Sequence, residues 1–531
     1  MNMKRIISII LAVAAMPMAA TAVKAQSAYD AFNYSTQDYY GTARSIAMGN
    51  AFTALGGDMG GISINPAGSG VYRYSEIAFT LGGSFSRTNA SGMALSGHSP
   101  SETGFSNNVR NAQNVFTMPN FGAVLNFNLH RTRGLKAVNI GFFYNRTQDY
   151  NMAFGGSGIN AATSWAGALA AGTNGISSSR FDRNSYFSGL PWGSVLGWNT
   201  GAISNFGNAP DTEYAGITEN IEQLSDGSYR ISTGGDLDQR ASYRTYGNKS
   251  DLIINAGFNF SDIIYAGVNL GFVMMDYTMD RRFSEYAVNP LDFQTGFVSL
   301  RDRYVLQTTG RGFYAKFGII ARPIAGLRIG AAIQTPTGTT ISERWFEDLD
   351  VVSNGGSSSD GTPEGNFNYR LTSPFRYNLG LAYTFGNFGL ISFDYESVNY
   401  GSMRFKNTDR STDGFDAIND DIYRLYGASH SFRAGLEINI NPYVAVRGGF
   451  NMITPGELSL QGNSGNNTYI YSGGLGFKTN GSFYADLAFR YNDNPDIYYK
   501  PYADYIDDMP SPQLRVKNKL MSFVATIGFR F

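Results

Sequence analysis

Residues Ala43–Gly70 read ARSIAMGNAFTALGGDMGGISINPAGSG, and we expect the rest of the chain to be organised around this segment. Glycine recurs throughout it, with small or apolar residues such as Ala47, Met48 and Phe52 between the glycines. Glycine permits tight turns and close backbone approach but weakens long helices, so we expect two or three short helical pieces. The Asn-Pro-Ala-Gly run at 65–68 closes the segment, and its proline is expected to stop any helix and fix a turn. Helical pieces this short are not stable alone, so we expect them to pack inside the rest of the chain.

The composition excludes several classes of function. The chain has 531 residues, a formal net charge of −1 and no cysteine. Nothing therefore points to nucleic acid, and neither a disulfide framework nor a thiolate metal site is possible. There are three histidines, no two of them predicted neighbours, so we predict no haem or other cofactor and no metal site. Ser431 beside His430 is not a catalytic triad, because adjacent strand residues point to opposite faces, and we predict no enzyme activity. Gly 63, Tyr 34 and Phe 38 with a mean hydropathy of −0.21 suit strands that have one apolar face.

The amino terminus has the pattern of a secretory signal peptide. Lys4 and Arg5 form a basic start, Ile6–Ala20 is an apolar run, and residues 23–25 (Val-Lys-Ala) fit a small-residue cleavage site. We therefore predict that residues 1–25 are removed. No later apolar stretch reaches the roughly 20 residues that a transmembrane helix needs. The protein is expected to leave the cytoplasm without a helical anchor.

From residue 76 onward the sequence alternates with period two. In residues 264–274 every second side chain is large and apolar, and the residues between them are polar or small. Elsewhere charged residues alternate with apolar ones, which indicates strands with one face toward lipid and one toward a wet or plugged interior. Fourteen such strands are predicted, centred near Phe79, Ala123, Ile140, Ile254, Val268, Phe317, Ile329, Leu379, Ile391, Leu436, Val446, Leu475, Leu487 and Ala525.

The connections between these strands alternate between short and long. The short ones are His130–Gly134, Asn259–Asp262, Arg322–Gly326, Gly386–Asn387, Asn441–Pro442 and Asn480–Gly481. An outer-membrane barrel has short periplasmic turns, long external loops and an even strand number, and it must close because lipid tolerates no open edge. The last strand ends at the aromatic Phe531, which resembles the terminal signal by which the barrel-assembly machinery recognises its clients. The predicted fold is a 14-stranded antiparallel transmembrane β-barrel with a helical hatch inside.

The order of leader, glycine-rich plug and fourteen strands resembles the FadL/TodX family of outer-membrane transporters for long-chain fatty acids and hydrocarbons. The match lies in the plug, at residues 41–44 (Gly-Thr-Ala-Arg), 48–52 (Met-Gly-Asn-Ala-Phe), 56–58 (Gly-Gly-Asp) and 64–68 (Ile-Asn-Pro-Ala-Gly). The resemblance implies a hatch at 26–75, a barrel at 76–531 and a monomer. It also implies that ligands leave sideways beside a kinked third strand, which we place at Ala137–Asn145. One departure is the unusually long connection 147–250.

The predicted function is passive outer-membrane transport of hydrophobic molecules, such as long-chain fatty acids, with lateral release into the membrane. An apolar solute gains nothing by entering a water-filled pore, so a dry route is needed. Expected partners are the lipophilic ligand, the surrounding outer-membrane lipid and lipopolysaccharide, and the assembly machinery. Two alternatives stay open: a porin-like channel for polar solutes, and a surface adhesin or structural barrel that binds through its loops.

Three groups of residues are candidates for a role in transport. The hatch motif comprises Asn65, Pro66, Ala67 and Gly68, whose turn is either functional or only a structural corner. Arg44 and Asp58 of the hatch are expected to pair with lumen-facing charges, and if those charges stayed unpaired they would instead line a water channel. The lumen-facing charges are predicted to be Lys316, Arg328, Arg433, Glu437, Arg447, Asp486 and Arg490.

The long connection carries the third group of candidates, Trp165, Trp192 and Trp198. These tryptophans form either a ligand-capture shelf, or a small loop core or a set of interface aromatics. Two short helices are expected in the same connection, over Asn160–Ala171 and Tyr214–Leu224.

Overall fold

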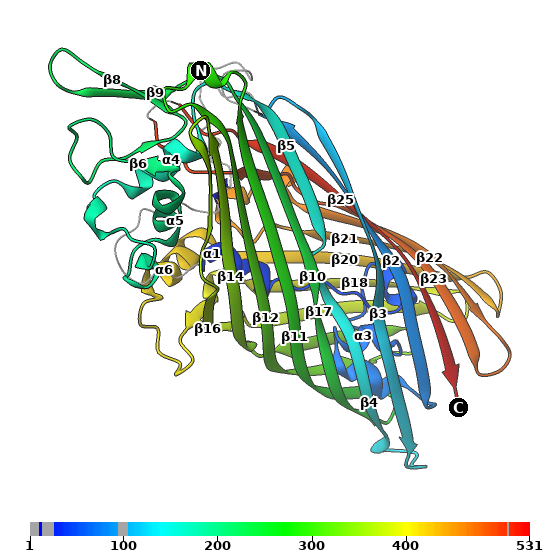
Figure 1. The fold of residues 1–531 in the computed structure, drawn as a ribbon. Helices are drawn as coiled ribbons and strands as arrows, with labels where there is room; N and C mark the ends of the chain where they lie inside the picture. Colours follow the sequence, from blue (N-terminus) through cyan, green and yellow to red (C-terminus); the bar gives the residue numbers. More distant parts are fainter. Residues whose placement is uncertain (1–9, 13–25, 94–104, 507–508) are drawn as a thin grey trace.

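The computed structural model describes residues 10–12, 26–93, 105–506 and 509–531 (Figure 1). The predicted leader, residues 1–25, therefore lies outside the described residues except for β1 (Ile10–Ala12), which pairs in parallel with β24 (Ile497–Lys500). Removal of the leader stays a prediction.

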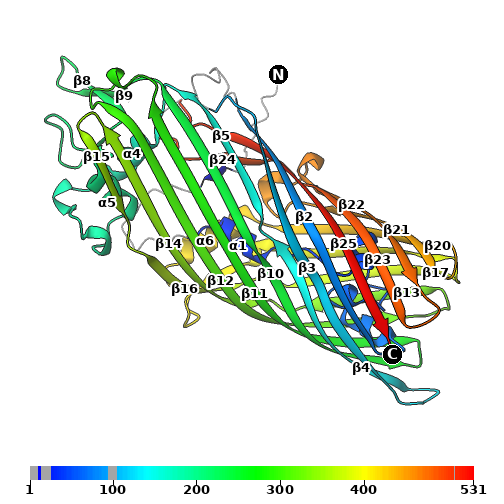
Figure 2. The same cartoon turned by 45° about the vertical axis from the view of Figure 1, so that its right-hand side comes forward.

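Fourteen long strands close into an antiparallel barrel (Figures 1 and 2). Each strand pairs with the next, and the last pairs with the first along the whole length of both. The strands are β2 (Glu76–Gly92), β3 (Val109–Asn128), β4 (Leu135–Asp149), β10 (Leu237–Phe260), β11 (Ile264–Ala287), β12 (Phe297–Ala321), β13 (Leu327–Gln334), β17 (Arg376–Phe385), β18 (Gly389–Asn399), β20 (Ala428–Asn439), β21 (Val444–Ile453), β22 (Thr468–Lys478), β23 (Phe483–Asp493) and β25 (Leu514–Arg530). Every predicted strand centre lies in one of them, which confirms the predicted barrel.

The outer face of the barrel defines its membrane-spanning part. On β11 the outward side chains of Ile264, Leu270 and Phe272 are exposed and apolar, with exposed fractions of 42%, 41% and 45%. From Asp276 onward the outward positions of the same strand become polar. β11 has 24 residues, whereas about ten tilted residues cross a bilayer, so the strand continues well beyond the membrane at the end with the long loops. A closed barrel with such an apolar band is the architecture of outer-membrane proteins.

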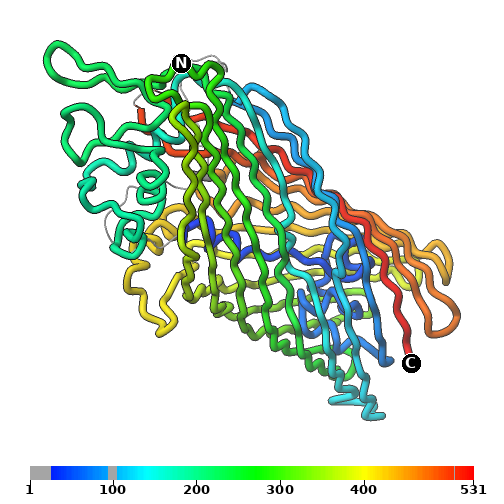
Figure 3. Tube along the Cα trace, in the orientation of Figure 1, coloured from blue at the N-terminus to red at the C-terminus, as the bar shows by residue number. Residues whose placement is uncertain are grey.

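The segment 26–75, which we call the hatch, lies inside the barrel (Figure 3). It comprises α1 (Ala28–Ser35), α2 (Ala43–Ala47), α3 (Met59–Ile62) and the 3₁₀ helix η1 (Pro66–Val71). The short pieces follow from the glycines, as expected. The predicted role of the proline was wrong, because η1 begins at the proline: its fixed φ suits a first helical position, where no N–H is required. In the described part of the chain, no helix is long and apolar enough to cross a membrane.

The long connections cover the other end of the barrel. Between β4 and β10 lie β5 (Met152–Asn160), α4 (Trp165–Thr173), η2 (Ser178–Arg180), η3 (Ser185–Phe187), α5 (Trp192–Thr200), β6 (Ile203–Ser204), β7 (Ala215–Gly216), β8 (Glu219–Gln223) and β9 (Tyr229–Thr233). We call residues 161–236 the cap. The first predicted helix overlaps α4. The second, Tyr214–Leu224, was wrong, because its residues form β7 and β8 and pair with β6 and β9.

Shorter elements complete the loop end of the molecule. β14 (Gly338–Ser353) extends the wall beside the outer part of β12. The other elements are η4 (Pro290–Asp292), β15 (Gly356–Gly361), β16 (Gly365–Thr372), η5 (Tyr400–Ser402), β19 (Arg404–Lys406), α6 (Asp416–Leu425), η6 (Leu458–Leu460) and η7 (Ser464–Asn466).

Candidate functional site

The hatch motif is tied to the barrel wall through Asn65. Its side chain is fully buried, its Oδ1 accepts from the Ala67 N–H at 3.0 Å, and its Nδ2 donates to the Thr53 carbonyl at 2.6 Å. Nδ2 also lies 3.2 Å from the carbonyl oxygen of Ile319 on β12. A Cβ at Gly318 would lie 1.9 Å from the Asn65 Oδ1, so only glycine in the wall lets the motif approach this closely. Asn65 thus caps η1 and docks it to the wall.

The other motif residues make backbone contacts with the wall and the hatch. A Cβ at Gly267 of β11 would lie 2.3 Å from the Pro66 carbonyl oxygen. Ala67 is fully buried, and the Gly68 carbonyl accepts from the Gly57 N–H at 2.9 Å. The motif is therefore a packed junction between two hatch turns and the wall. Its role in transport stays a prediction.

Arg44 joins the hatch to a chain of charges on the wall. Its guanidinium donates to both carboxylate oxygens of Glu437, at 2.8 and 3.1 Å. Arg447 donates to Glu437 at 2.6 Å and to Asp486 at 2.5 Å. Asp58 accepts from the Thr42 hydroxyl at 2.7 Å and caps α3. The structure thus brings Arg44 into the lumen network, whereas the direct hydrogen bonds of Asp58 stay within the hatch.

The remaining predicted lumen charges also have partners, most of them on the hatch. Glu396 of β18 accepts from Arg376 at 2.5 Å, from Arg433 at 2.8 Å and from the Tyr39 hydroxyl at 2.8 Å. Lys316 donates to the Ser63 carbonyl at 2.7 Å. Arg490 forms an ion pair with Asp38, and Arg328 bonds the Leu55 carbonyl. Arg433 and Arg490 are therefore paired with carboxylates, whereas Lys316 and Arg328 bond main-chain carbonyls of the hatch.

The plug leaves little free volume at this level. A cavity of about 20 Å³ lies between the end of α1 and the wall, beside Tyr34, Lys249, Asp251 and Arg376. That volume has room for about one water molecule. Lys249 fills the space further by donating to the Tyr34 carbonyl at 2.9 Å. This cavity is too small to hold a ligand.

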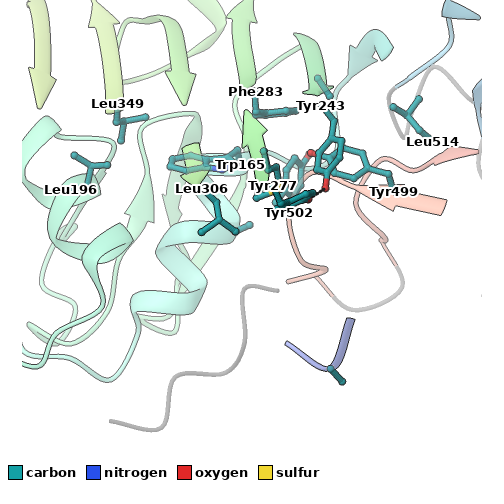
Figure 4. Packing of buried hydrophobic residues seen from close by; sticks show 14 of the residues in the cluster. Trp165, Leu196, Tyr243, Tyr277, Phe283, Leu306, Leu349, Tyr499, Tyr502 and Leu514 are labelled. Atoms are coloured by element: carbon teal, nitrogen blue, oxygen red, sulfur yellow. Dashed lines mark hydrogen bonds between the residues drawn. The ribbon is translucent and has the colours of Figure 1, made fainter. Parts of the chain in front are cut away.

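The outer part of the lumen has a different character, because tyrosines and other apolar side chains pack together there (Figure 4). A largely buried charged group of Arg281, Asp302 and Glu347 lies in the same outer part. Phe154 of β5 stacks on Tyr243 of β10 with ring centroids 4.8 Å apart. Tyr277 of β11 meets Tyr150 at 5.2 Å, and its hydroxyl lies 3.5 Å from that of Tyr243. Tyr499 of β24 completes the cluster, 5.6 Å from Tyr243. We call these five residues the tyrosine cluster; the sequence prediction missed them, although Tyr243 and Tyr277 sit at inward positions of their strands.

The three candidate tryptophans lie in different environments. Trp165 begins α4 above the outer lumen and is 8% exposed. Trp192 lies 5.9 Å from Trp345, and Trp198 stacks on Phe181 at 5.6 Å inside the cap. Among the described ring contacts, none joins two of the three candidates. Trp165 is a buried member of the large apolar cluster that also holds the tyrosines, and Trp192 and Trp198 pack against the margin of that cluster. A capture role for these tryptophans stays a prediction.

Two buried carboxyl groups lie where the cap meets the barrel and within the cap. Glu285 lies near the loop end of β11, outside the membrane-spanning part, and accepts from the Trp165 N–H of the cap at 2.7 Å and from Gln239 at 2.8 Å. Glu219 of β8 lies in the cap and accepts from the Gly216 N–H at 2.7 Å. Burial, with a smaller contribution from Glu219, raises the pKa of Glu285 from 4.5 to about 7. Burial likewise raises the pKa of Glu219 to about 7.

The hydrogen-bonded wall is interrupted between β3 and β4. The two strands pair only as far as Asn120 and Asn145, whose side chains bond at 2.7 Å. In the part of the chain that the structure describes, β3 has no β4 partner from Val109 to Pro119. Proline donates no hydrogen bond and belongs at a sheet edge, so Pro119 is the sequence signal that marks the break.

Beyond this point β4 and then β5 stay paired with β10 but turn away from β3. Arg146 and Thr147 are neighbours in sequence and both are buried, which is the mark of a bulge because strand side chains alternate in direction. The chain then continues as β5, which contacts inward-facing residues of the wall. The Thr88 hydroxyl bonds the Ala153 carbonyl, and a Cβ at Gly156 would meet the Leu514 side chain. The inward bend therefore places β5 behind the edge of β3, at the strand for which the resemblance implied a kink.

Comparisons with known proteins agree with this geometry. No protein-family model matches the chain, and no curated protein matches it. A solved FadL homologue from Pseudomonas aeruginosa has a TM-score of 0.50 and 10% identity, covering 92% of this chain and 98% of its own. The toluene transporter TbuX of Ralstonia pickettii gives 0.47 at 14% identity, over 93% and 99%. The toluene transporter TodX of Pseudomonas putida gives 0.46 at 11%, over 94% and 100%. The likeness to the first shows that this chain has the FadL fold.

Proposed function

We propose that this barrel lets hydrophobic molecules, such as long-chain fatty acids or similar lipophilic compounds, cross an outer membrane down their concentration gradient. The observation that carries the proposal is the break in the wall between β3 and β4, where lipid-exposed strands would otherwise stay paired. The shared fold with a FadL homologue supports it. So does the plug, because its paired charges fill the part of the lumen that a polar solute would need.

The route begins beneath the cap. The tyrosine cluster and its neighbours Met275 and Met279 are buried and packed together, and they would give an apolar surface with hydroxyl groups at its edges once a solute parts them. A lipophilic solute exchanges one dry surface for another there, which avoids the cost of crossing water. Trp165 lies at the top of this surface, so it is the tryptophan we assign to capture. Binding must stay weak at each step for the solute to move on.

The route ends at the break in the wall. Beyond Asn120 the edge of β3 faces β5 through few bonds, such as Asn107 Nδ2 to Ser157 Oγ at 3.0 Å. The outward residues Phe116 and Met118 are exposed by 74% and 37% in this stretch, so the break lies at the apolar band. Separation of β3 from β5 would release the solute sideways into the bilayer. This exit avoids the charged lower lumen.

A disulfide across the break tests this proposal, because the chain has no cysteine of its own. In the variant N107C/S157C the disulfide would hold β5 against β3. We expect oxidised cells to take up labelled long-chain fatty acid at less than about a fifth of the wild-type rate, with recovery on reduction. The control N126C/N139C places a disulfide between β3 and β4 below the break, where the side chains bond at 2.7 Å, and should leave uptake unchanged. Equal uptake in both oxidised variants would contradict the lateral exit.

A further inference from the structure

The lipid-facing wall carries an apolar groove across β22, β23, β25, β2 and β3. Its volume is about 470 Å³, in the range of small-molecule sites. The exposed side chains that line it are Leu81, Phe116, Leu475, Leu487, Phe489 and Phe523. Gly473 and Ala525 form its floor: a Cβ at Gly473 would meet nothing closer than the Arg447 carbonyl oxygen, at 3.6 Å. The groove therefore exists because a small residue occupies an outward position in each of two strands.

A cluster of basic side chains lies beyond the groove on the same outward face, toward the long loops. We call Arg87, Arg110, Lys517 and Lys519 the outer basic cluster. Arg87 stands directly opposite Lys519 across the β2–β25 pair, and Arg110 and Lys517 both stand opposite Asn89. All four are exposed. Lys519 and the groove residue Phe523 are four residues apart on one face of β25, about 13 Å at 3.3 Å per residue.

The charges of this cluster lack counter-ions within the chain. Among the described residues, no carboxylate forms an ion pair with any of the four. Asp493 stands opposite Lys519 in the β23–β25 pair but forms no ion pair with it. Asp496 forms its ion pair with Arg515. Like charges directly opposite each other destabilise a strand pair, so the Arg87–Lys519 pair favours an external anion.

Three arginines on β10, β11 and β12 are ion-paired instead. Arg240 of β10 pairs with Asp238 at 2.6 Å, and Arg282 of β11 and Arg303 of β12 both pair with Asp280 at 3.0 Å. These residues also face outward beyond the apolar band. Ion pairing on the outer face therefore differs from residue to residue, and the outer basic cluster differs from these three by having no acidic partner.

We propose that the groove and the outer basic cluster together form a binding site for an outer-leaflet lipid whose headgroup carries phosphate. Its acyl chain lies in the groove, and its phosphate accepts hydrogen bonds from Arg87, Lys517 and Lys519. The cluster lies on the side of the long loops, which places the headgroup in the outer leaflet. The groove shares Phe116 with the edge of the break, but the site lies on the outer face of the wall and does not depend on the proposed function.

The test measures lipid retained by the purified full-length protein, by native mass spectrometry in detergent with added bisphosphorylated lipid A. We expect R87Q/K517Q/K519Q to retain at least about tenfold less lipid A than the wild type. The control R240Q/R282Q/R303Q removes the same charge from β10, β11 and β12, where each arginine is ion-paired, and should stay within about twofold. Equal losses in both variants, or no loss in the first, would overturn the proposal.

Two further measurements separate the lipid from a simple anion. The variant Gly473→Leu fills the groove without changing charge, and we expect a loss of at least about fivefold in bound lipid A. Dephosphorylated lipid A should bind as weakly to the wild type as lipid A binds to the triple variant. Binding of inorganic phosphate alone with the affinity of lipid A would identify a free-phosphate site and contradict the lipid. Heat-modifiable gel migration verifies that each variant is folded, and Gly473→Leu remains informative if the triple variant is not.

Discussion

Arg44 and Glu437 form a two-bond ion pair that fastens the hatch to β20, and Arg447 binds the same carboxylate from the next strand. The Glu437 side chain is 10% exposed. One wall residue therefore holds a hatch cation and a wall cation together. The integrity of the plug depends on such contacts, because the hatch has no β-sheet ladder of its own that joins it to the barrel.

The variant Glu437→Gln should loosen the hatch and leave the barrel intact. Removing one partner of a buried pair costs about 3–5 kcal/mol, because the other charges lose their compensation. We expect open-channel events in planar bilayers, where the wild type should be silent. Stable ohmic conductance of the wild type would instead favour the porin-like alternative. Asp350→Asn, which changes an exposed carboxylate in β14 at the loop end, is the matched control and should stay silent.

The variant Asn65→Ala tests the hatch motif. It leaves the Thr53 carbonyl and the Ala67 N–H without their side-chain partner, at a cost of about 1–3 kcal/mol for each group that stays buried and unpaired. The barrel ladder keeps all its bonds, so heat-modifiable migration should persist while fatty-acid uptake changes. Loss of the folded band at ordinary temperature would mean that Asn65 is a structural corner only.

The cap should be better protected at pH 5 than at pH 8. The pKa of Glu285 and of Glu219 is raised to about 7 in the folded cap, from an ordinary value of 4.5. The folded state thus binds more protons than the unfolded one between these values, so cap stability falls as pH rises from about 4.5 to about 7 and then levels off. Hydrogen exchange within residues 161–236, corrected for intrinsic rates, measures this change.

The variant Glu285→Gln is the control for this pH effect. It keeps an oxygen that can accept from the Trp165 N–H, and it removes one of the two titrating groups. We expect the difference in protection between the two pH values to shrink by at least about half. The neighbouring Tyr502 and Tyr505 do not titrate in this range, because burial raises the pKa of each above 10. If cap protection in this variant depends on pH as it does in the wild type, Glu285 does not cause the pH effect.

The fluorescence of Trp165 should be quenched by a bound ligand more strongly than that of Trp198. Trp165 packs in the cluster above the outer lumen, whereas Trp198 stacks on Phe181 within the cap. Brominated long-chain fatty acid should quench the fluorescence of a variant that keeps only Trp165 at least about twice as strongly as one that keeps only Trp198. Equal quenching would contradict a role of Trp165 in ligand capture and would indicate that both residues are purely structural.

The barrel could be predicted from the sequence because each strand carries its own alternating pattern. Alternation at each strand reports one lipid face and one lumen face, and predicted lumen charges such as Lys316 and Arg447 do point inward, where each has a hydrogen-bond partner. The predicted connection 147–250 was too long, because alternation continues along β4 to Asp149 and begins again in β10 at Leu237. Polar outward residues in these extensions hid the strands from a search for apolar faces.

The site was harder to predict because it depends on contacts between distant segments. The tyrosine cluster combines β5, β10, β11 and β24, and no local pattern brings Phe154 to Tyr243 and Tyr499. The break beside β4 is set by where pairing stops, which a single strand does not encode. Pro119 was the one local signal, since proline rarely lies inside a fully paired strand.

Photo-crosslinking with a diazirine-bearing long-chain fatty acid in intact outer membranes can map the proposed route from beneath the cap to the break in the wall. Labels located by mass spectrometry should fall on Tyr243, on Tyr277 and on the stretch Val109–Pro119. The N107C/S157C disulfide should remove the labels on the last stretch. Labels confined to lipid-facing residues such as Phe272 and Phe313, with none beneath the cap or at the break, would contradict this route.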